Sequence, residues 1–210
     1  MVFKDRIEAG KKLAVKLNEK YPQIQNAIVL ALPRGGVVVG AEVARVLNLP
    51  LDIIVTRKIG APLNPEYAVA AVSEHEMIPN PHENIDDQYL KMKAEKERQE
   101  IQRRMKEYRG RKQKIDLTDK TVFLVDDGLA TGLTMAVAIK EVQRQNPSKI
   151  IIAVPVAPPQ TIDNLKPKVD EIIVLNIEPL FLAVGQFYEN FPQTTDEEVI
   201  KLLRSSNNDS

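Results

Sequence analysis

The fold is decided by the stretch Val122-Phe123-Leu124-Val125-Asp126-Asp127-Gly128-Leu129-Ala130-Thr131-Gly132-Leu133-Thr134. Its first four residues are apolar, which predicts a buried strand. Two adjacent carboxylates follow, and then a turn with glycine and threonine leads into an amphipathic helix over 134–145. Backbone N–H groups and the helix dipole at such a helix start favour phosphate binding. The stretch therefore predicts a strand, an anion-binding loop and a helix.

Asp126 and Asp127 form the acidic pair of this stretch. Ionised carboxylates are costly to bury unpaired, so two in succession suit the paired hydroxyls of a ribose or a hydrated Mg²⁺. For one aspartate alone, capping of the turn before the helix is the simpler interpretation. A P-loop is excluded because no Gly-Lys-Ser/Thr follows the turn, and the absence of Gly-x-Gly-x-x-Gly argues against a dinucleotide-binding site.

Short apolar runs alternate with amphipathic helices along the chain. We expect helices over 5–17, 37–47, 134–145 and 196–203, and strands over 27–32, 52–55, 67–72, 121–125, 149–155 and 172–175. This alternation predicts an α/β fold, a parallel sheet flanked by helices, in one domain over residues 1–204. The runs are apolar almost throughout, as in strands covered on both faces. The polar residues 205–210 are expected to form a disordered tail.

Composition excludes several classes of site. The chain has no cysteine, which rules out disulfides, thiolate metal sites and cysteine nucleophiles and is typical of a reducing compartment. Lys plus Arg and Asp plus Glu number 29 each, so net charge argues neither for nor against a nucleic-acid partner. No apolar run is long enough to cross a bilayer, and residues 1–6 become charged at once. We therefore expect a cytoplasmic protein without a membrane partner.

Two further loops follow predicted strands. Arg34-Gly35-Gly36 follows the first strand, where two glycines permit close approach of an anion and the arginine fork suits phosphate. Arg57 and Lys58 follow the second strand and would repel each other without an anion or water between them. Each loop alone is equally explained as a plain turn or a solvated strand end. Together with the loop after the acidic pair, they predict one anionic ligand.

At these residues the chain resembles the type I phosphoribosyltransferases. Their motif for 5-phosphoribosyl-1-pyrophosphate is an apolar strand, an acidic pair and a loop ending Thr-Gly-x-Thr, as in 122–134. The resemblance implies that Asp126 and Asp127 hold the ribose hydroxyls, or Mg²⁺ directly or through water. The cations implied to stabilise departing pyrophosphate are Arg34, Arg57 and Lys58. The implied substrate-binding residues are Gly35, Gly36, Gly128, Leu129, Ala130, Thr131, Gly132, Leu133 and Thr134.

The chain from Asp5 to Leu203 is similar to an uncharacterised bacterial and archaeal branch of this family. The implied function is transfer of the phosphoribosyl group to an unidentified nitrogenous base with release of pyrophosphate, with Mg²⁺ as cofactor, by a homodimer. Ala130 replaces the aspartate that acts as general base in hypoxanthine-guanine enzymes, which disfavours a 6-oxopurine and leaves adenine open. A regulatory protein that binds phosphoribosyl pyrophosphate or a nucleotide, and a phosphatase or hydrolase using the same site, are the alternatives.

We expect a helical insert over 83–114 and a C-terminal hood over 155–193. Five apolar residues of the insert fall on one side of a helix: Leu90, Ala94, Ile101, Met105 and Tyr108. Residues 91–114 contain 11 Lys or Arg against 4 Glu, so this helix is a solvated element packed on the domain, a positively charged lid or, least favoured, a nucleic-acid-binding arm.

The clustered aromatic residues of the predicted hood are Phe187, Tyr188 and Phe191, which either stack on the acceptor base or belong to the core. The resemblance also implies that the Arg34–Gly36 loop can contain a strained peptide. His75 and His82, the only histidines, are interpreted as surface residues rather than a metal pair.

Overall fold

The computed structural model of the chain describes residues 1–65, 67–83, 85–110 and 113–206. Five parallel strands form a central sheet in the order β2-β1-β6-β7-β8, and three antiparallel strands form a second sheet in the order β3-β4-β5. The parallel strands are β1 (Ala27–Ala31), β2 (Leu51–Ile53), β6 (Thr121–Val125), β7 (Lys149–Ala157) and β8 (Glu171–Ile177). The antiparallel strands are β3 (Arg57–Gly60), β4 (Ala68–Val72) and β5 (Met77–Pro79). The predicted α/β fold with a parallel sheet is confirmed.

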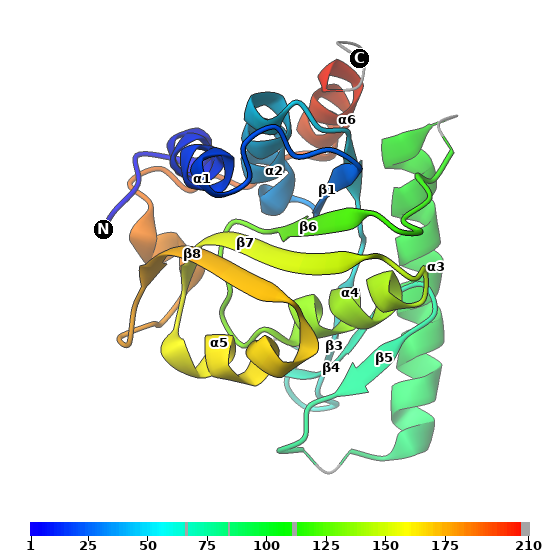
Figure 1. Ribbon diagram of the computed structural model, residues 1–210. Coiled ribbons are helices and arrows are strands. Elements are labelled where there is room, and N and C mark those ends of the chain that lie inside the picture. Colours follow the sequence, from blue (N-terminus) through cyan, green and yellow to red (C-terminus); the bar gives the residue numbers. More distant parts are fainter. Residues whose placement is uncertain (66, 84, 111–112, 207–210) are drawn as a thin grey trace.

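Helices cover both faces of the parallel sheet, with α1, α2 and α6 on one side and α4 and α5 on the other (Figure 1). The helices are α1 (Arg6–Lys20), α2 (Gly35–Leu47), α3 (Asp87–Arg109), α4 (Leu133–Gln143), α5 (Pro159–Leu165) and α6 (Asp196–Ser205), with short 3₁₀ segments η1 (Lys166–Lys168) and η2 (Val184–Phe187). Asp5 begins α1 by accepting a 2.8 Å bond from the Glu8 N–H. Thr195 and Glu198 form a capping box that begins α6.

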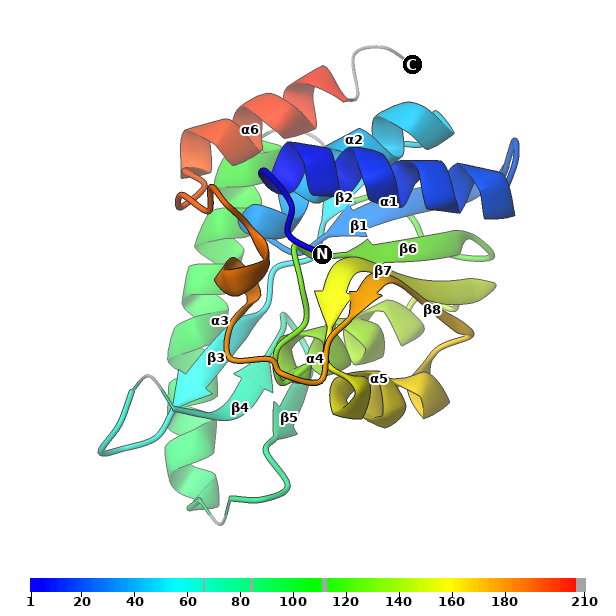
Figure 2. The same cartoon turned by 90° about the vertical axis from the view of Figure 1, so that its left-hand side faces the viewer.

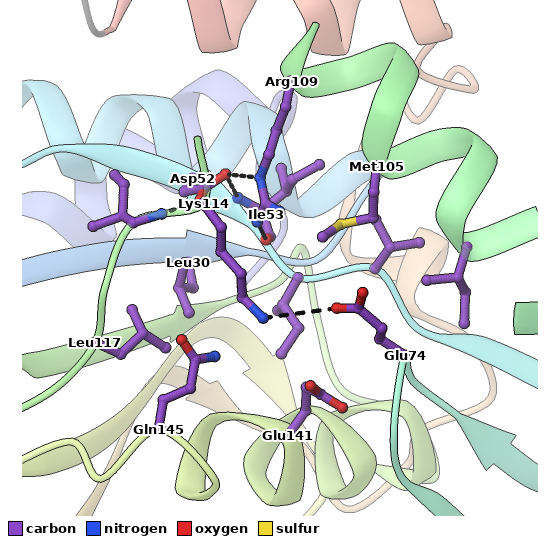
Figure 3. Close-up of a pocket in the computed structure, with 14 residues that line it drawn as sticks. Leu30, Asp52, Ile53, Glu74, Met105, Arg109, Lys114, Leu117, Glu141 and Gln145 are labelled. Carbon is purple, nitrogen blue, oxygen red and sulfur yellow. Dashed lines mark hydrogen bonds and ion pairs between the residues drawn. The ribbon is translucent and has the colours of Figure 1, made fainter. Parts of the chain in front are cut away.

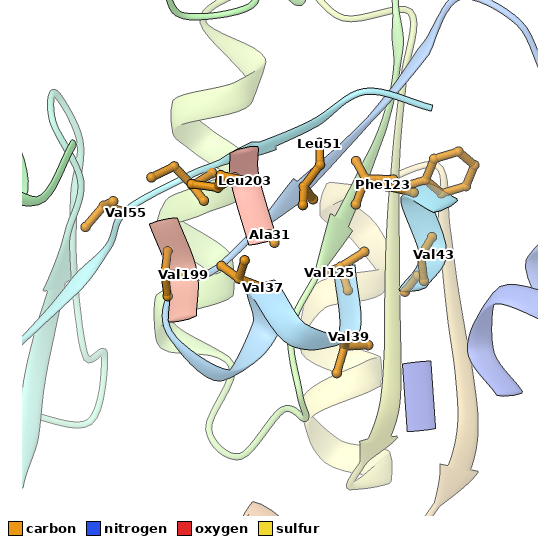
Figure 4. Packing of buried hydrophobic residues seen from close by; sticks show 14 of the residues in the cluster. Ala31, Val37, Val39, Val43, Leu51, Val55, Phe123, Val125, Val199 and Leu203 are labelled. Atoms are coloured by element: carbon orange, nitrogen blue, oxygen red, sulfur yellow. The ribbon is translucent and has the colours of Figure 1, made fainter. Parts of the chain in front are cut away.

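β6 lies in the middle of the sheet because its residues are apolar enough to be covered on both faces. Phe123 and Val125 face a cluster that also contains Val37 and Val43 of α2 and Val199 of α6 (Figure 4). Burial of each such side chain stabilises the fold by about 1.5–3 kcal/mol. The packing fixes the carboxyl end of β6, and with it the residues that follow.

The strand expected over 67–72 does form, as β4, but it does not join the parallel sheet. It pairs antiparallel with β3 and β5. The described residues of the short connection from β3 to β4 form no crossover helix, and a parallel pairing needs one. Arg57 and Lys58 are part of β3, so the prediction that they lie in a loop after the second strand is wrong.

The helix of the predicted insert is α3, which packs against the domain (Figure 1). Leu90, Ala94, Ile101 and Tyr108 are buried, and Met105 is half-buried. Residues 84, 111 and 112 of the insert lie outside the described residues. In the predicted tail, Ser205 instead ends α6, and residues 207–210 are not described. Within the described ranges, no helix combines the length and apolar character needed to span a membrane.

Candidate functional site

The acidic pair lies at the carboxyl end of β6. Val125, the last residue of this strand, pairs with Ala31 of β1 and Ala153 of β7, so the chain leaves the sheet at its centre. Asp126 then accepts a 2.8 Å hydrogen bond at Oδ1 from the backbone N–H of Asp127. In open α/β sheets this edge is where ligands bind.

Arg6, the first residue of α1, holds the second carboxylate of the pair. Its Nε donates a 2.8 Å bond to Asp127 Oδ2, and its Nη1 donates a 2.7 Å bond to the Pro192 carbonyl. The guanidinium carbon lies 3.7 Å from the centre of the Phe191 ring. Arg6 was not predicted as a site residue. The sequence does carry a signal for it, because Arg6 lies on the same helix face as the buried Ala9 and Leu13.

Burial dominates the electrostatics of the acidic pair. It raises the pKa of Asp126 well above the usual value, and the neighbouring Asp127 carboxylate adds to the shift. Burial raises the pKa of Asp127 as well, while the Arg6 guanidinium acts against it. The two carboxyls together therefore resist carrying two full negative charges until a ligand supplies hydrogen bonds or positive charge.

Hydrogen bonds to neighbouring segments fix the loop between the acidic pair and the start of α4. The Leu129 N–H donates to the Val156 carbonyl at 2.9 Å, and Thr161 Oγ1 donates to the Ala130 carbonyl at 2.5 Å. Gly132 precedes α4 with a φ of 74°, a backbone conformation that favours glycine. The first N–H groups of α4 have no intrahelical acceptor, which suits a phosphate.

The other residues predicted in this loop surround these contacts. Gly128 and Leu129 are buried, Thr131 is exposed, and Leu133 and Thr134 are half-buried in the first turn of α4. A Cβ on Gly128 would approach a Val184 methyl to 2.7 Å, so the hood segment leaves no space for a side chain there.

Gly35 and Gly36, predicted in a loop, are the first two residues of α2, and this helix start packs directly on the acidic pair. A Cβ on Gly35 would overlap Asp127 Oδ2, and one on Gly36 would lie 2.9 Å from Asp126 Cα. The peptide between Pro33 and Arg34 is cis. Arg34 itself lies 3.6 Å from Asp196 of α6, measured from Nη1 to Oδ1. The structure thus brings two of the three predicted loops together.

Arg57 and Lys58 are not joined to this pair by any hydrogen bond or ion pair among the described residues. Arg57 Nε lies 2.8 Å from Glu97 Oε2 of α3, and Lys58 is exposed on β3. Three of the eight Lys and Arg residues of α3 also form ion pairs, since Arg103 and Arg104 bind Glu100 and Arg109 binds Asp52. This pairing reduces the positive field expected from the composition of the insert.

The hood segment runs from the end of β8 to the start of α6 (Figure 2). Phe187 and Tyr188 are buried and pack with Phe3, so they belong to the core and are not available to stack on a base. The Tyr188 hydroxyl donates a 2.6 Å bond to the Asp127 carbonyl. Strands β7 and β8 account for residues 155–157 and 171–177 of the predicted hood, so these residues belong to the parallel sheet.

A mostly apolar cavity of about 20 Å³ lies between α3 and α4, large enough for a single water (Figure 3). Asp52, Glu74 and Glu141 line it, together with Lys114 and Arg109. None of the predicted site residues is among those that line it.

Beside this cavity, Glu141 forms a cluster with the first histidine. The buried Glu141 accepts hydrogen bonds from Ser73 Oγ at 2.7 Å and from the His75 N–H at 3.0 Å, and it lies 2.8 Å from His75 Nδ1. Burial alone would raise the pKa of Glu141, but these bonds outweigh it and lower that pKa. Oxygen and nitrogen atoms of Glu74, His75 and Glu141 lie within 4.8 Å of one another. Both His75 and His82 are exposed, as expected.

The comparisons with known proteins agree with the predicted family. The phosphoribosyl transferase domain family matches residues 3–190. Two curated proteins of Mycobacterium tuberculosis, from strains CDC 1551 / Oshkosh and ATCC 25618 / H37Rv, each carry the name "Putative phosphoribosyl transferase". Each is 36% identical over 215 residues, which cover 99% of this chain and 48% of the relative. The chain spans about half the length of the curated relatives it matches.

Solved structures agree with the fold. The protein TT1426 from Thermus thermophilus is 40% identical with a TM-score of 0.82, covering 98% of this chain and 99% of that one. A hypothetical protein from Neisseria gonorrhoeae with bound ppGpp is 14% identical with a TM-score of 0.50, covers 99% and 96%, and shares the fold alone. From the family match and the curated relatives together, the chain belongs to the phosphoribosyl transferase domain family.

Proposed function

We propose that this protein transfers the phosphoribosyl group of 5-phosphoribosyl-1-pyrophosphate to a nitrogenous base and releases pyrophosphate. The observation that carries the proposal is the contact of the Gly35-Gly36 turn with Asp126 and Asp127, at the point where the next loop opens α4. An acidic pair for hydroxyls and two backbone loops for phosphates thereby lie together. Family membership supports the reaction class.

In the proposed reaction, a ring nitrogen of the base forms a bond to the anomeric carbon as the bond to the pyrophosphate oxygen breaks. Asp126 and Asp127 bind the ribose hydroxyls and stabilise the positive charge that develops on the sugar. The loop over Gly128–Thr134 binds the 5-phosphate at the start of α4. Arg34 lies beside Gly35 and is proposed to stabilise the leaving pyrophosphate. To do so, its guanidinium would leave Asp196 and bind the pyrophosphate instead.

The donor atoms of the acidic pair fit Mg²⁺, a hard cation that prefers carboxylate and water oxygens. Asp126 Oδ1 accepts from a backbone N–H and Asp127 Oδ2 from Arg6, so each residue keeps a second oxygen for the ligand. When bound with the substrate, Mg²⁺ would reduce the negative charge that the leaving pyrophosphate must carry. These two carboxylates would hold it directly, through water, or through the ribose hydroxyls. Arg57 and Lys58 are proposed to contact the pyrophosphate group once the substrate is bound.

The first experiment is calorimetric titration with 5-phosphoribosyl-1-pyrophosphate, with and without Mg²⁺, followed by assays of pyrophosphate release with purine, pyrimidine and pyridine bases. Micromolar, Mg²⁺-dependent binding and base-dependent release are expected. The double variant Asp126→Asn, Asp127→Asn should lose binding, while Asp163→Asn on the exposed side of α5 should retain it.

Three other results would each contradict part of the proposal. A folded wild-type protein that binds no phosphoribosyl pyrophosphate would exclude the donor site. Tight binding without release for any base would favour the regulatory alternative. Slow release of pyrophosphate without a base would favour a hydrolase.

A further inference from the structure

Arg6 is the one cation in the described part of the chain that forms an ion pair with the acidic pair. Its side chain is 10% exposed and that of Asp127 is 15% exposed. A buried ion pair of this kind is expensive to desolvate, so it persists where geometry and further hydrogen bonds compensate. The Pro192 carbonyl and the face of the Phe191 ring supply those further contacts.

The position of Arg6 is set by both ends of the chain. The Phe3 N–H donates to the Phe187 carbonyl at 2.8 Å, and the Glu189 N–H donates back to the Phe3 carbonyl at 2.8 Å. The Asn190 N–H donates to the Lys4 carbonyl at 3.0 Å. The residues before α1 are thus bound to the hood segment, and Arg6 points from this junction to Asp127.

Three polar groups face the Asp127 side chain or its carbonyl: the Arg6 guanidinium from α1, the Asp126 carboxyl from the same loop and the Tyr188 hydroxyl from the hood. Of these only Arg6 carries a positive charge. A Cβ on Gly35 would lie 2.7 Å from Arg6 Nε, so the glycine turn also closes over the ion pair.

We infer that Arg6 is a positioning residue that holds Asp127 as an oriented carboxylate and commits its Oδ2, leaving Oδ1 for one ribose hydroxyl. This inference rests on the proposed function for the identity of the ligand. It adds that the hood and the donor site are joined through one side chain.

The simpler alternative is that Arg6 only attaches α1 to the hood. The two roles differ in the side-chain orientation of Asp127, compared in crystal structures of the ligand-free wild type and variants, and in the affinity for phosphoribosyl pyrophosphate measured by calorimetry. Arg6→Gln removes the charge, and Arg6→Lys keeps it. Arg109→Gln is the control, because Arg109 is also buried and forms a 2.8 Å ion pair, but with Asp52 and not with the acidic pair.

If Arg6 positions Asp127, the Asp127 side chain changes its orientation in Arg6→Gln while Phe3 stays bound to the hood, and the affinity for phosphoribosyl pyrophosphate falls about tenfold. Arg6→Lys restores most of both effects, and Arg109→Gln lowers stability without either. An Arg6→Gln protein that loses stability but keeps the wild-type orientation of Asp127 and the wild-type affinity overturns the inference.

Two further outcomes are decided by the ligand-free crystal structures. If the wild type binds no phosphoribosyl pyrophosphate, the proposed function fails, and the orientation of Asp127 in Arg6→Gln alone supports or overturns the role of Arg6. If Arg6→Gln does not fold, Arg6→Lys decides: Asp127 bound by the lysine in the wild-type orientation supports the inference, and a changed orientation with wild-type affinity overturns it.

Discussion

Arg57 of β3 and Glu97 of α3 form an ion pair with 2.8 Å between Nε and Oε2. The pair joins the antiparallel sheet to the helix of the insert. Its arginine side chain is 35% exposed, and ion pairs with such exposure stabilise a protein by less than about 1 kcal/mol. A pyrophosphate group could therefore displace Glu97 at small cost.

This relationship predicts opposite effects of two substitutions on pyrophosphate affinity. Glu97→Gln frees Arg57 and is expected to raise the affinity by no more than about fivefold, the equivalent of the ion pair. Arg57→Gln should lower it by about tenfold or more. Titration calorimetry with Mg²⁺-pyrophosphate measures both. Equal affinity in all three proteins would remove Arg57 from the proposed site.

Asp126→Asn is expected to stabilise the ligand-free protein at pH 7 while abolishing substrate binding. Burial raises the pKa of Asp126 well above its usual value, so the folded chain holds a proton that the unfolded chain releases near about pH 4. Ionisation of this residue therefore reduces stability as the pH rises above that value. The asparagine removes this loss.

Thermal unfolding from pH 4 to pH 8 measures this effect, with Asp163→Asn as an exposed control. The increase in unfolding temperature caused by Asp126→Asn should become smaller towards pH 4. An increase that becomes larger on acidification would mean that the Asp126 carboxylate ionises at low cost in the folded protein, contrary to its burial.

Thr161→Val tests the support of the phosphate loop. Valine keeps the shape of the buried side chain but removes the donor to the Ala130 carbonyl, at a cost of about 1 kcal/mol. We expect a lower urea midpoint and weaker binding of phosphoribosyl pyrophosphate, because the loop before Gly132 loses a fixed contact. Thr161→Ser retains the hydroxyl and should retain the affinity. A loss in Thr161→Ser as large as that in Thr161→Val would show that the hydroxyl alone does not hold the loop.

Asp52→Asn tests the attachment of α3. Asp52 accepts from Arg109 Nε at 2.8 Å, and both side chains are about nine-tenths buried. Leaving Arg109 without its partner is expected to lower the free energy of unfolding by about 3 kcal/mol. Arg103→Gln breaks an exposed pair on the same helix and should leave the urea midpoint unchanged. Similar midpoints for the two variants would show that the buried pair does not hold the helix.

Local sequence was sufficient to predict β6, the acidic pair and the start of α4. Apolar residues over 121–125 have one stable environment, a strand covered on both faces, and the strand observed has the same bounds. The glycines of both loops were predicted for close approach of a ligand. Gly35 and Gly36 contact the acidic pair, whereas Gly128 and Gly132 contact Val184 and Thr161, and these contacts explain why larger residues do not fit.

Prediction failed where pairing between distant segments decides the structure. β3 and β5 are short and only partly buried, so their residues carry little periodicity until β4 lies between them. Arg57 was placed in a loop for the same reason. Hood aromatics are equally apolar in a core or against a base, and only the packing of Phe187 and Tyr188 on Phe3 separates the two.

By itself, the sequence determined the α/β class, the order of the central elements and the residue types of the anion-binding loops, because these depend on local hydrophobicity and turn chemistry. Only the tertiary structure decided that Arg6 meets Asp127 across 121 positions of the chain. The same is true of Arg57, whose partner is Glu97 on the insert. An ion pair between distant residues depends on which surfaces pack together, and that packing is a property of the whole fold.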